Sequence, residues 1–156
     1  LYEKKNAVNT EELVVFNKSR HSIIGYNKNG LLMVYHSLDS LSIQNLGVIK
    51  EYKIGERVIN VHYENEIPNL IKFKKEYVLV VDSLGIYAIN GIENPIVLLR
   101  TSPKVNLERL IKVLQPKHII ADASNYKSQI ANWKFICDKN NIPFTYTQVD
   151  GAFILK

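Results

Sequence analysis

One stretch decides how this chain folds: residues 114–126, which read Leu114-Gln115-Pro116-Lys117-His118-Ile119-Ile120-Ala121-Asp122-Ala123-Ser124-Asn125-Tyr126. It begins as the end of a helix, and Pro116 stops that helix because proline has no amide hydrogen to continue it. The apolar run at 118–121 is typical of a strand buried on both faces. The polar cluster that follows it predicts a turn.

Apolar residues recur at helical spacing on both sides of this stretch. Asn106 is a good N-cap residue, and the apolar positions after it return every three to four residues. The same spacing continues from Ser128 to Lys139. We therefore predict helices near 106–114 and 128–140. Their inward side chains, Leu110, Leu114, Trp133 and Ile136, are expected to pack against strands at 96–99 and 119–121.

Short apolar runs separated by turn residues predict strands in the rest of the chain. Asn29-Gly30 is a hairpin signal because both residues tolerate a positive φ. Asp150-Gly151 predicts a turn that joins the last two strands, and one or two helical turns are expected at 39–45. Besides 96–99 and 118–121, strands are predicted at 12–16, 22–26, 31–36, 48–53, 58–63, 70–73, 77–81, 86–89, 143–147 and 152–155. The fold class is therefore α/β, of the α+β kind, with one mixed sheet covered by helices on one side.

Length and composition indicate one folded domain over residues 1–156. Hydrophobic residues make up 46% of the chain, with only 7 glycines and 5 prolines, which argues against disorder. The longest apolar runs fall far short of the ~20 residues that cross a membrane. The stretch Leu1–Asn9 is polar and has no initiator methionine, so we expect a part of a longer protein. A net charge of +5 permits a nucleic-acid or anionic partner without requiring one.

Histidine and cysteine are present without a metal-binding pattern. His21, His36, His62 and His118 stand alone in the sequence, at none of the spacings of a zinc site. The lone cysteine, Cys137, excludes an internal disulfide and lies on an apolar helical face. It is therefore interpreted as a small core residue.

Carboxylates and one polar loop stand at the ends of predicted strands. Asp39, Asp82, Asp122 and Asp150 each follow an apolar run, where an aspartate either starts a turn or delivers a carboxylate to a site. The loop 17–22, Asn-Lys-Ser-Arg-His-Ser, offers basic side chains and amides that could hold a phosphate. The alternative for this loop is an ordinary solvated connection between strands. No Walker loop, GxGxxG or GxSxG motif occurs.

Three segments together resemble a known family. They are 13–25 with the strand 32–36, the stretch 114–126 quoted above, and 142–155 with Ile142-Pro143-Phe144 and Gly151-Ala152-Phe153-Ile154-Leu155. In this order they resemble the C-terminal soluble domain of ComEC competence proteins, in the form of Bacteroidetes-type members. The likeness of the last segment includes a closing hairpin.

The resemblance implies a setting and a scaffold. ComEC proteins are inner-membrane proteins that conduct single-stranded DNA into the cell, and their C-terminal domain is expected on the extracytoplasmic side. That domain is metallo-β-lactamase-like and is thought in many members to degrade the non-transported strand with two metal ions. This chain lacks the HxHxDH motif of such a site. It has Arg100-Thr101-Ser102-Pro103 where a histidine-histidine-glycine-serine turn is expected, and Lys127-Ser128-Gln129 in place of glycine-histidine-proline.

The hypothesis is a reduced metallo-β-lactamase-like domain, a fragment of a larger membrane protein, with no catalytic residue, metal ligand or cofactor. Positive charge replaces the missing ligands, so the predicted partner is single-stranded DNA, bound weakly and non-specifically, together with the rest of the membrane channel and other competence proteins. The nucleic-acid-binding residues are predicted to be Lys18, Arg20, Arg100, Lys104 and Lys127. Two alternatives stay open: a cryptic nuclease with one metal ion on Asp39, Asp82 or Asp122, and a protein-docking domain.

Overall fold

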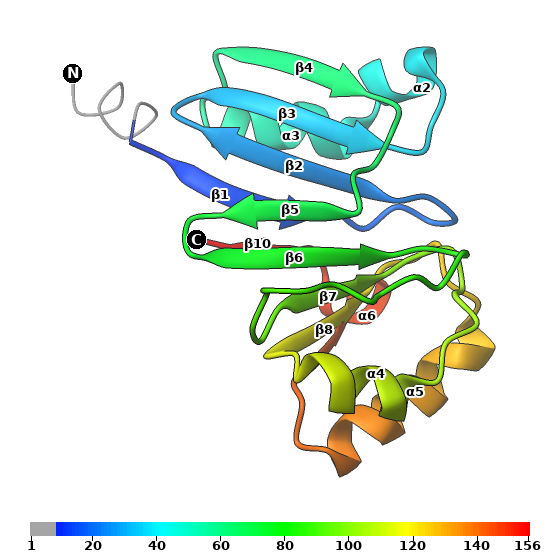
Figure 1. Ribbon diagram of the computed structural model, residues 1–156. Coiled ribbons are helices and arrows are strands. Elements are labelled where there is room, and N and C mark those ends of the chain that lie inside the picture. Colours follow the sequence, from blue (N-terminus) through cyan, green and yellow to red (C-terminus); the bar gives the residue numbers. More distant parts are fainter. Residues whose placement is uncertain (1–8) are drawn as a thin grey trace.

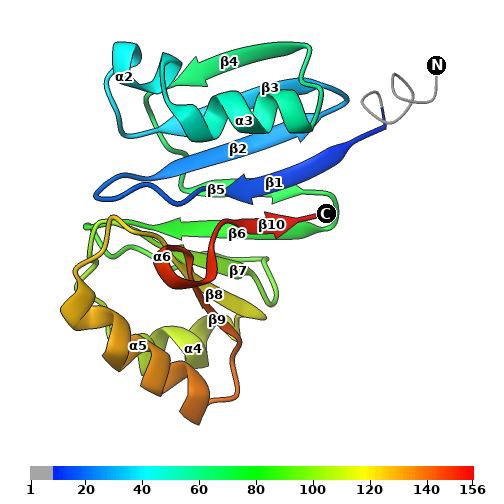
Figure 2. The same ribbon diagram turned by 180° about the vertical axis from the view of Figure 1, so that it is seen from behind.

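Two β-sheets lie face to face, and helices cover the outer face of each, so the chain builds four layers (Figures 1 and 2). The computed structural model describes residues 9–156. All but the last residue of the polar stretch Leu1–Asn9 therefore lies outside the described residues.

The first sheet combines the N-terminal strands with the last strand of the chain, in the order β10-β1-β2-β3-β4. β1, β2 and β3 are antiparallel, and the β2–β3 hairpin turns at Asn29 (φ 56°) and Gly30 (φ 84°), as predicted. β4 pairs with β3 in parallel, because two helices carry the chain across between them. The elements are β1 (Glu11–Val15), β2 (Ile23–Lys28), β3 (Leu31–His36), α2 (Ser40–Gln44), α3 (Gly47–Gly55), β4 (Asn60–Glu64) and β10 (Phe153–Leu155).

The second sheet has the order β5-β6-β7-β8-β9. β5 and β6 form an antiparallel hairpin, while β6, β7, β8 and β9 are parallel. α4 and α5 are the connections that parallel neighbours require. The elements are β5 (Leu70–Phe73), β6 (Glu76–Val81), β7 (Ile96–Leu99), α4 (Leu107–Leu114), β8 (His118–Ala121), α5 (Lys127–Lys139), β9 (Phe144–Tyr146) and α6 (Thr147–Asp150).

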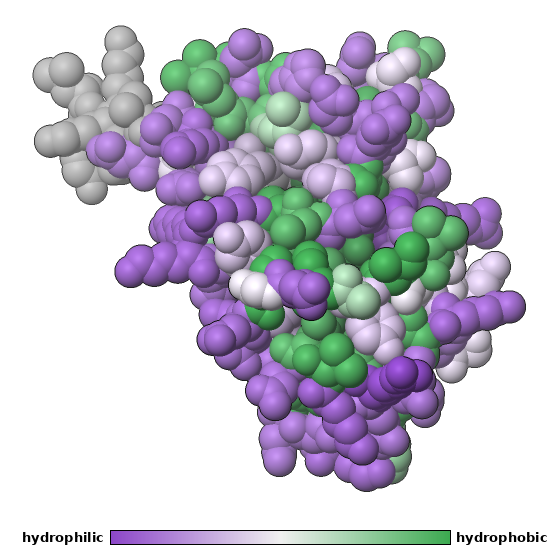
Figure 3. All heavy atoms as spheres, in the orientation of Figure 1, coloured by the Kyte–Doolittle hydropathy of each residue, from purple (hydrophilic) through white to green (hydrophobic). Residues whose placement is uncertain are grey.

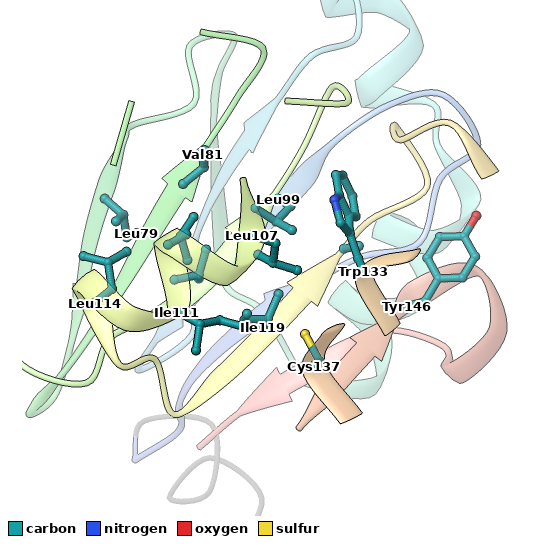
Figure 4. Close-up of a cluster of buried hydrophobic side chains, with 13 residues drawn as sticks. Leu79, Val81, Leu99, Leu107, Ile111, Leu114, Ile119, Trp133, Cys137 and Tyr146 are labelled. Carbon is teal, nitrogen blue, oxygen red and sulfur yellow. The ribbon is translucent and has the colours of Figure 1, made fainter. Parts of the chain in front are cut away.

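Among the described residues, the hydrophobic core has three parts, one between each pair of neighbouring layers. The middle part joins the sheets and contains Leu13 and Ile24 of the first sheet and Phe73 and Leu98 of the second. A second part lies between the first sheet and α2–α3. The third lies between the second sheet and α4–α5 (Figure 4). The strands β7 and β8 are buried on both faces, which explains their unbroken apolar sequences.

The two predicted helices of the C-terminal third are confirmed. Asn106 caps α4 by accepting a hydrogen bond from the Arg109 amide at 3.1 Å. Leu110, Leu114 and Trp133 are buried against the second sheet, and Ile136 is half-buried beside them. Cys137 is fully buried in the same cluster, as its place on the apolar face predicted.

The prediction of one sheet with helices on one side is wrong, because the strands divide into two sheets and helices lie on both outer faces. The predicted closing hairpin is also wrong. β9 pairs with β8 in the second sheet, whereas β10 pairs with β1 in the first. The short helix α6 carries the chain from one sheet to the other, where a direct turn at Asp150-Gly151 was expected. These pairings are non-local, and no local sequence signal specifies them.

Two predicted strands are absent from the described residues. The segment 48–53 lies in helix α3, because Ile49 and Tyr52 are three residues apart and cover the first sheet from one helix face. The segment 86–89 joins no ladder, since β6 already has β5 and β7 as neighbours. It crosses the sheet instead, and Tyr87 and Ile89 pack on the α4–α5 side.

The interior of β2 sets a sharp steric limit at Gly25. A Cβ atom there would lie 2.8 Å from Cε2 of Phe16 and 3.3 Å from Cδ1 of Leu32, and both side chains are buried. We expect Gly25→Ala to lower the free energy of unfolding by about 1–3 kcal/mol, measured by urea denaturation. Gly55→Ala in α3 is the matched control, because its Cβ would meet nothing within 4 Å. It should raise stability by about 0.5–1 kcal/mol. Equal effects at both positions would contradict the described packing of β2.

Candidate nucleic-acid interface

The polar loops of both sheets gather at one edge of the sandwich, on the right in Figure 1. The parallel strands β6–β9 bring their carboxyl ends to one edge of the second sheet, the usual position of binding sites in such sheets. β1 and β3 of the first sheet end on the same side. We call this surface the loop edge; it consists of residues 16–22, 37–39, 82–85, 100–106, 122–127 and 147–151.

Hydrogen bonds hold the loop 16–22 of the first sheet to loops of the second. The Arg20 amide donates to the Ala123 carbonyl at 3.0 Å. Arg100 Nε donates to Ser22 Oγ at 3.0 Å. Arg20 takes up a left-handed backbone conformation (φ 67°), which a non-glycine residue keeps only where the surroundings enforce it. The loop 17–22, for which the sequence left a phosphate site and an ordinary connection open, is thus a fixed part of the loop edge.

The turn after β7 is bound to the turn after β8. The amides of Thr101 and Ser102 donate to Ser124 Oγ at 2.8 Å and Asn125 Oδ1 at 2.9 Å, and the Tyr126 amide donates to Ser102 Oγ at 2.7 Å. Thr101 and Ser102 are both left-handed, with φ of 55° and 53°. Two adjacent residues in this region cost about 1–3 kcal/mol each, and the three hydrogen bonds offset that strain. These amides are occupied, so they offer no donors to a ligand.

Asp122 is the buried charge of the loop edge, with 0% of its surface exposed. It accepts hydrogen bonds from the amide and hydroxyl of Ser124 at 3.1 and 2.5 Å. Burial raises the pKa of Asp122, while the hydrogen bonds from Ser124 and Ser22 and the positive charge of Arg100 oppose that rise. Arg100 is half-buried beside it. Ser22, Ser124 and Asn125 belong to polar stretches that the sequence indicates, but the sequence does not show that they join Asp122 to Arg100.

The structure separates the five predicted nucleic-acid-binding residues into two kinds. Three of them are exposed: Arg20, Lys104 and Lys127. Lys18 is half-exposed, and its backbone forms an isolated β-bridge with His21. Arg100 instead directs its guanidinium toward Ser22 and the buried Asp122. The backbone contact of Arg20 with Ala123 holds the Arg20 loop against the turn that precedes Lys127. Lys104 lies farther along, at a shallow groove of about 630 Å³ that Phe135 and Ile136 also line.

The aspartates of the single-metal alternative each have a structural partner. Asp39 caps α2 by accepting from the amide and hydroxyl of Ser42, both at 2.7 Å, and these bonds lower its pKa. Asp82 accepts from the Leu84 amide at 3.0 Å. Among residues 9–156, no three His, Cys, Asp or Glu side chains lie close enough together to hold a metal ion.

The histidines lie in four separate surroundings. His21 Nδ1 lies 3.2 Å from Ser37 Oγ, His62 is paired with Glu64 at 2.8 Å, and His118 Nε2 lies 2.7 Å from Thr145 Oγ1. Burial lowers the pKa of His36 and of His118. Burial also raises the pKa of Cys137 to about 12, which keeps this thiol protonated and unreactive.

Ser124 and Lys127 stand at the spacing of the serine–lysine pairs of some acyl-transfer enzymes. The Ser124 hydroxyl donates to Asp122 and accepts from the Thr101 amide. Lys127 is exposed at the start of α5. With both sides of its hydroxyl occupied, Ser124 serves as a link between the two turns.

Comparison with protein families matches residues 13–156, nearly the whole chain, to the ComEC C-terminal domain. The chain belongs to this family. It is therefore the C-terminal domain of a competence protein that acts in DNA uptake. No curated protein and no solved structure matches the chain. No helix of this ComEC domain, within residues 9–156, is long and apolar enough to cross a membrane.

Proposed function

We propose that this chain is a single, non-catalytic domain of a ComEC membrane protein that contacts single-stranded DNA during uptake. In this proposal the domain lies on the extracytoplasmic side of the inner membrane, as part of a larger channel of the Bacteroidetes type. Its scaffold is metallo-β-lactamase-like without the metal ligands. The four-layer order and the collection of loops at one edge of the sandwich support this assignment.

One observation carries the proposal: exposed positive charge lies at the loop edge, where the family would carry its metal ligands. Arg20 is fixed there by its backbone contact with Ala123, and Lys127 opens α5 four residues after that contact. Lys18 and Lys104 extend the positive charge along the edge. Such side chains neutralise phosphates and release counterions, which is the main source of non-specific affinity for nucleic acid.

The nuclease alternative has less support. Cleavage by metal ions needs open coordination sites on oxygen or nitrogen ligands. Asp39 is engaged in a helix cap and Asp82 in a turn, and Asp122 is buried beside Arg100. The alternative of a docking domain makes no demand on the basic residues, so a test on those residues separates it from DNA contact.

We expect the chain to bind a labelled single-stranded oligonucleotide at low salt with a Kd on the order of 10⁻⁴–10⁻⁶ M. The double variant Arg20→Glu/Lys127→Glu should bind at least tenfold more weakly, and the slope of log K against log salt should become shallower by about one for each phosphate that is no longer neutralised. Fluorescence anisotropy at several salt concentrations measures both quantities. Arg100 is kept in this variant because its guanidinium is hydrogen-bonded inside the loop edge.

The matched control is Lys28→Glu/Lys50→Glu, which makes the same change in net charge. Lys28 and Lys50 are exposed, but they lie at the β2–β3 turn and on α3, away from the loop edge. This control should keep most of the affinity. Absence of binding at low salt, or an equal loss in both double variants, would refute DNA contact at this edge and leave the docking domain.

A further inference from the structure

Tyr126 is the exposed aromatic residue of the loop edge. Its side chain is 72% exposed, although tyrosine is costly to leave in water. Its backbone, in contrast, is fixed: the Tyr126 amide donates to Ser102 Oγ at 2.7 Å, and Asn125 beside it is buried. Among the described residues, no hydrogen bond or ring contact engages the Tyr126 side chain. A rigid backbone thus presents a free ring.

Three segments that carry basic residues are joined to the backbone around Tyr126. Lys127 follows it directly, and Arg20 is hydrogen-bonded through its amide to Ala123, three residues before it. Ser102, which holds the Tyr126 amide, lies two residues before Lys104. Figure 3 has the same orientation as Figure 1, and it shows hydrophobic residues among hydrophilic ones at this edge, near the end of β6.

This combination matches the way in which proteins bind single strands. Cations follow the phosphates, and an aromatic ring stacks on a base, which is possible only where the base is unpaired. Because the backbone of Tyr126 is already held, little ordering cost would accompany stacking. A duplex offers the same phosphates but no free base face.

We infer that Tyr126 is a base-stacking residue, which makes the loop edge selective for unpaired bases over duplex DNA. The inference rests on the proposed function, since it needs the phosphates to be held by Arg20, Lys127 and their neighbours. It adds a contribution that salt does not screen.

The test compares Tyr126→Ala with Tyr126→Phe on two labelled strands of roughly 16 nucleotides, the upper end of what one small domain covers. One strand is oligothymidine and the other is abasic, with the same phosphates and no bases. Tyr126→Ala should weaken binding to oligothymidine about tenfold, the equivalent of ~1.4 kcal/mol for one stacked base. It should leave the abasic strand and the salt slope unchanged, while Tyr126→Phe should retain affinity.

Ile54→Ala is the matched control, because Ile54 is another exposed large apolar residue (79%) and lies on α3, away from the loop edge. If Tyr126→Ala binds both strands like the wild type while Arg20→Glu/Lys127→Glu binds neither, the inference is overturned and the proposed function stands. If the wild type binds no strand, both fail. Tyr126-dependent binding to anionic phospholipid vesicles, without binding to oligothymidine, would assign the ring to a membrane surface and also overturn the inference.

Discussion

Replacing Leu98 by alanine is expected to lower the free energy of unfolding by about 3–5 kcal/mol. Leu98 is 0% exposed and lies in the middle strand of the second sheet, facing the first. Its side chain fills the space between the sheets, near Leu13 and Ile24. Truncation removes the transfer free energy of the lost atoms and leaves a cavity that two paired sheets cannot close.

Urea denaturation followed by circular dichroism measures this change. Leu84→Ala is the control, because Leu84 is 76% exposed on the loop edge and should change stability by less than about 0.5 kcal/mol. If Leu98→Ala does not fold, Leu98→Val provides a smaller step of about 1 kcal/mol. Equal effects of Leu98→Ala and Leu84→Ala would contradict the face-to-face packing of the sheets.

The second large effect is expected from Arg100→Met, which should lower stability by about 3 kcal/mol at pH 8. Methionine keeps much of the aliphatic stem but removes the charge beside Asp122 and the hydrogen bond to Ser22. The Asp122 carboxylate would then be buried without a compensating cation. Arg20→Met is the matched control, because the Arg20 side chain is exposed and its fixed contact is made by the backbone.

The loss of unfolding free energy caused by Arg100→Met should depend on pH, and the titration of Asp122 determines whether it grows or shrinks as pH rises. Burial raises the pKa of this carboxyl in the folded state above the ordinary value of 3.8. The folded state therefore binds the proton more tightly, and the resulting stability is fully present below pH 3.8 and is lost as pH rises through the folded pKa. Removing Arg100 raises that pKa further, so the difference from the wild type should be small near pH 4 and larger at pH 8.

Unfolding curves of wild type and variant at several pH values test this prediction. The contributions of the other carboxyl groups to the free energy of unfolding cancel when the two proteins are compared. Adding Asp122→Asn to Arg100→Met should abolish most of the pH dependence, since the charge is then absent. A cost of Arg100→Met that is the same at pH 4 and pH 8 would show that Asp122 and Arg100 are not coupled.

Part of the candidate site was predictable, because strand ends are readable in sequence. The polar clusters at 17–22 and 122–125 were predicted at the ends of apolar runs, and the loop edge contains both. The sequence could not distinguish Arg100 from Arg20, since both are arginines in polar turns after a strand. The difference arises from neighbours far away in the chain: Ser22 and Asp122 surround Arg100, whereas the Arg20 side chain faces solvent.

The sequence by itself determined the elements whose signals are local. Periodic apolar residues specified α4 and α5, unbroken apolar runs specified β7 and β8, and Asn29-Gly30 specified the β2–β3 turn. In each case the residues that form the element also carry its pattern. The segment 48–53 was wrongly predicted as a strand, because its few apolar residues fit a helix and a strand equally well.

Only the tertiary structure decided how the strands divide into two sheets and where the last strand pairs. β10 pairs with β1, although the two strands lie near opposite ends of the sequence. β9 precedes β10 by only the short helix α6, yet it pairs with β8 in the other sheet. Strands pair through backbone hydrogen bonds, which do not depend on the identity of the side chains. The sequence of a strand therefore says little about which other strand it pairs with. The burial of Asp122, the fixed position of Arg20 and the exposure of Tyr126 all follow from that pairing, because it brings the loops of both sheets to one edge.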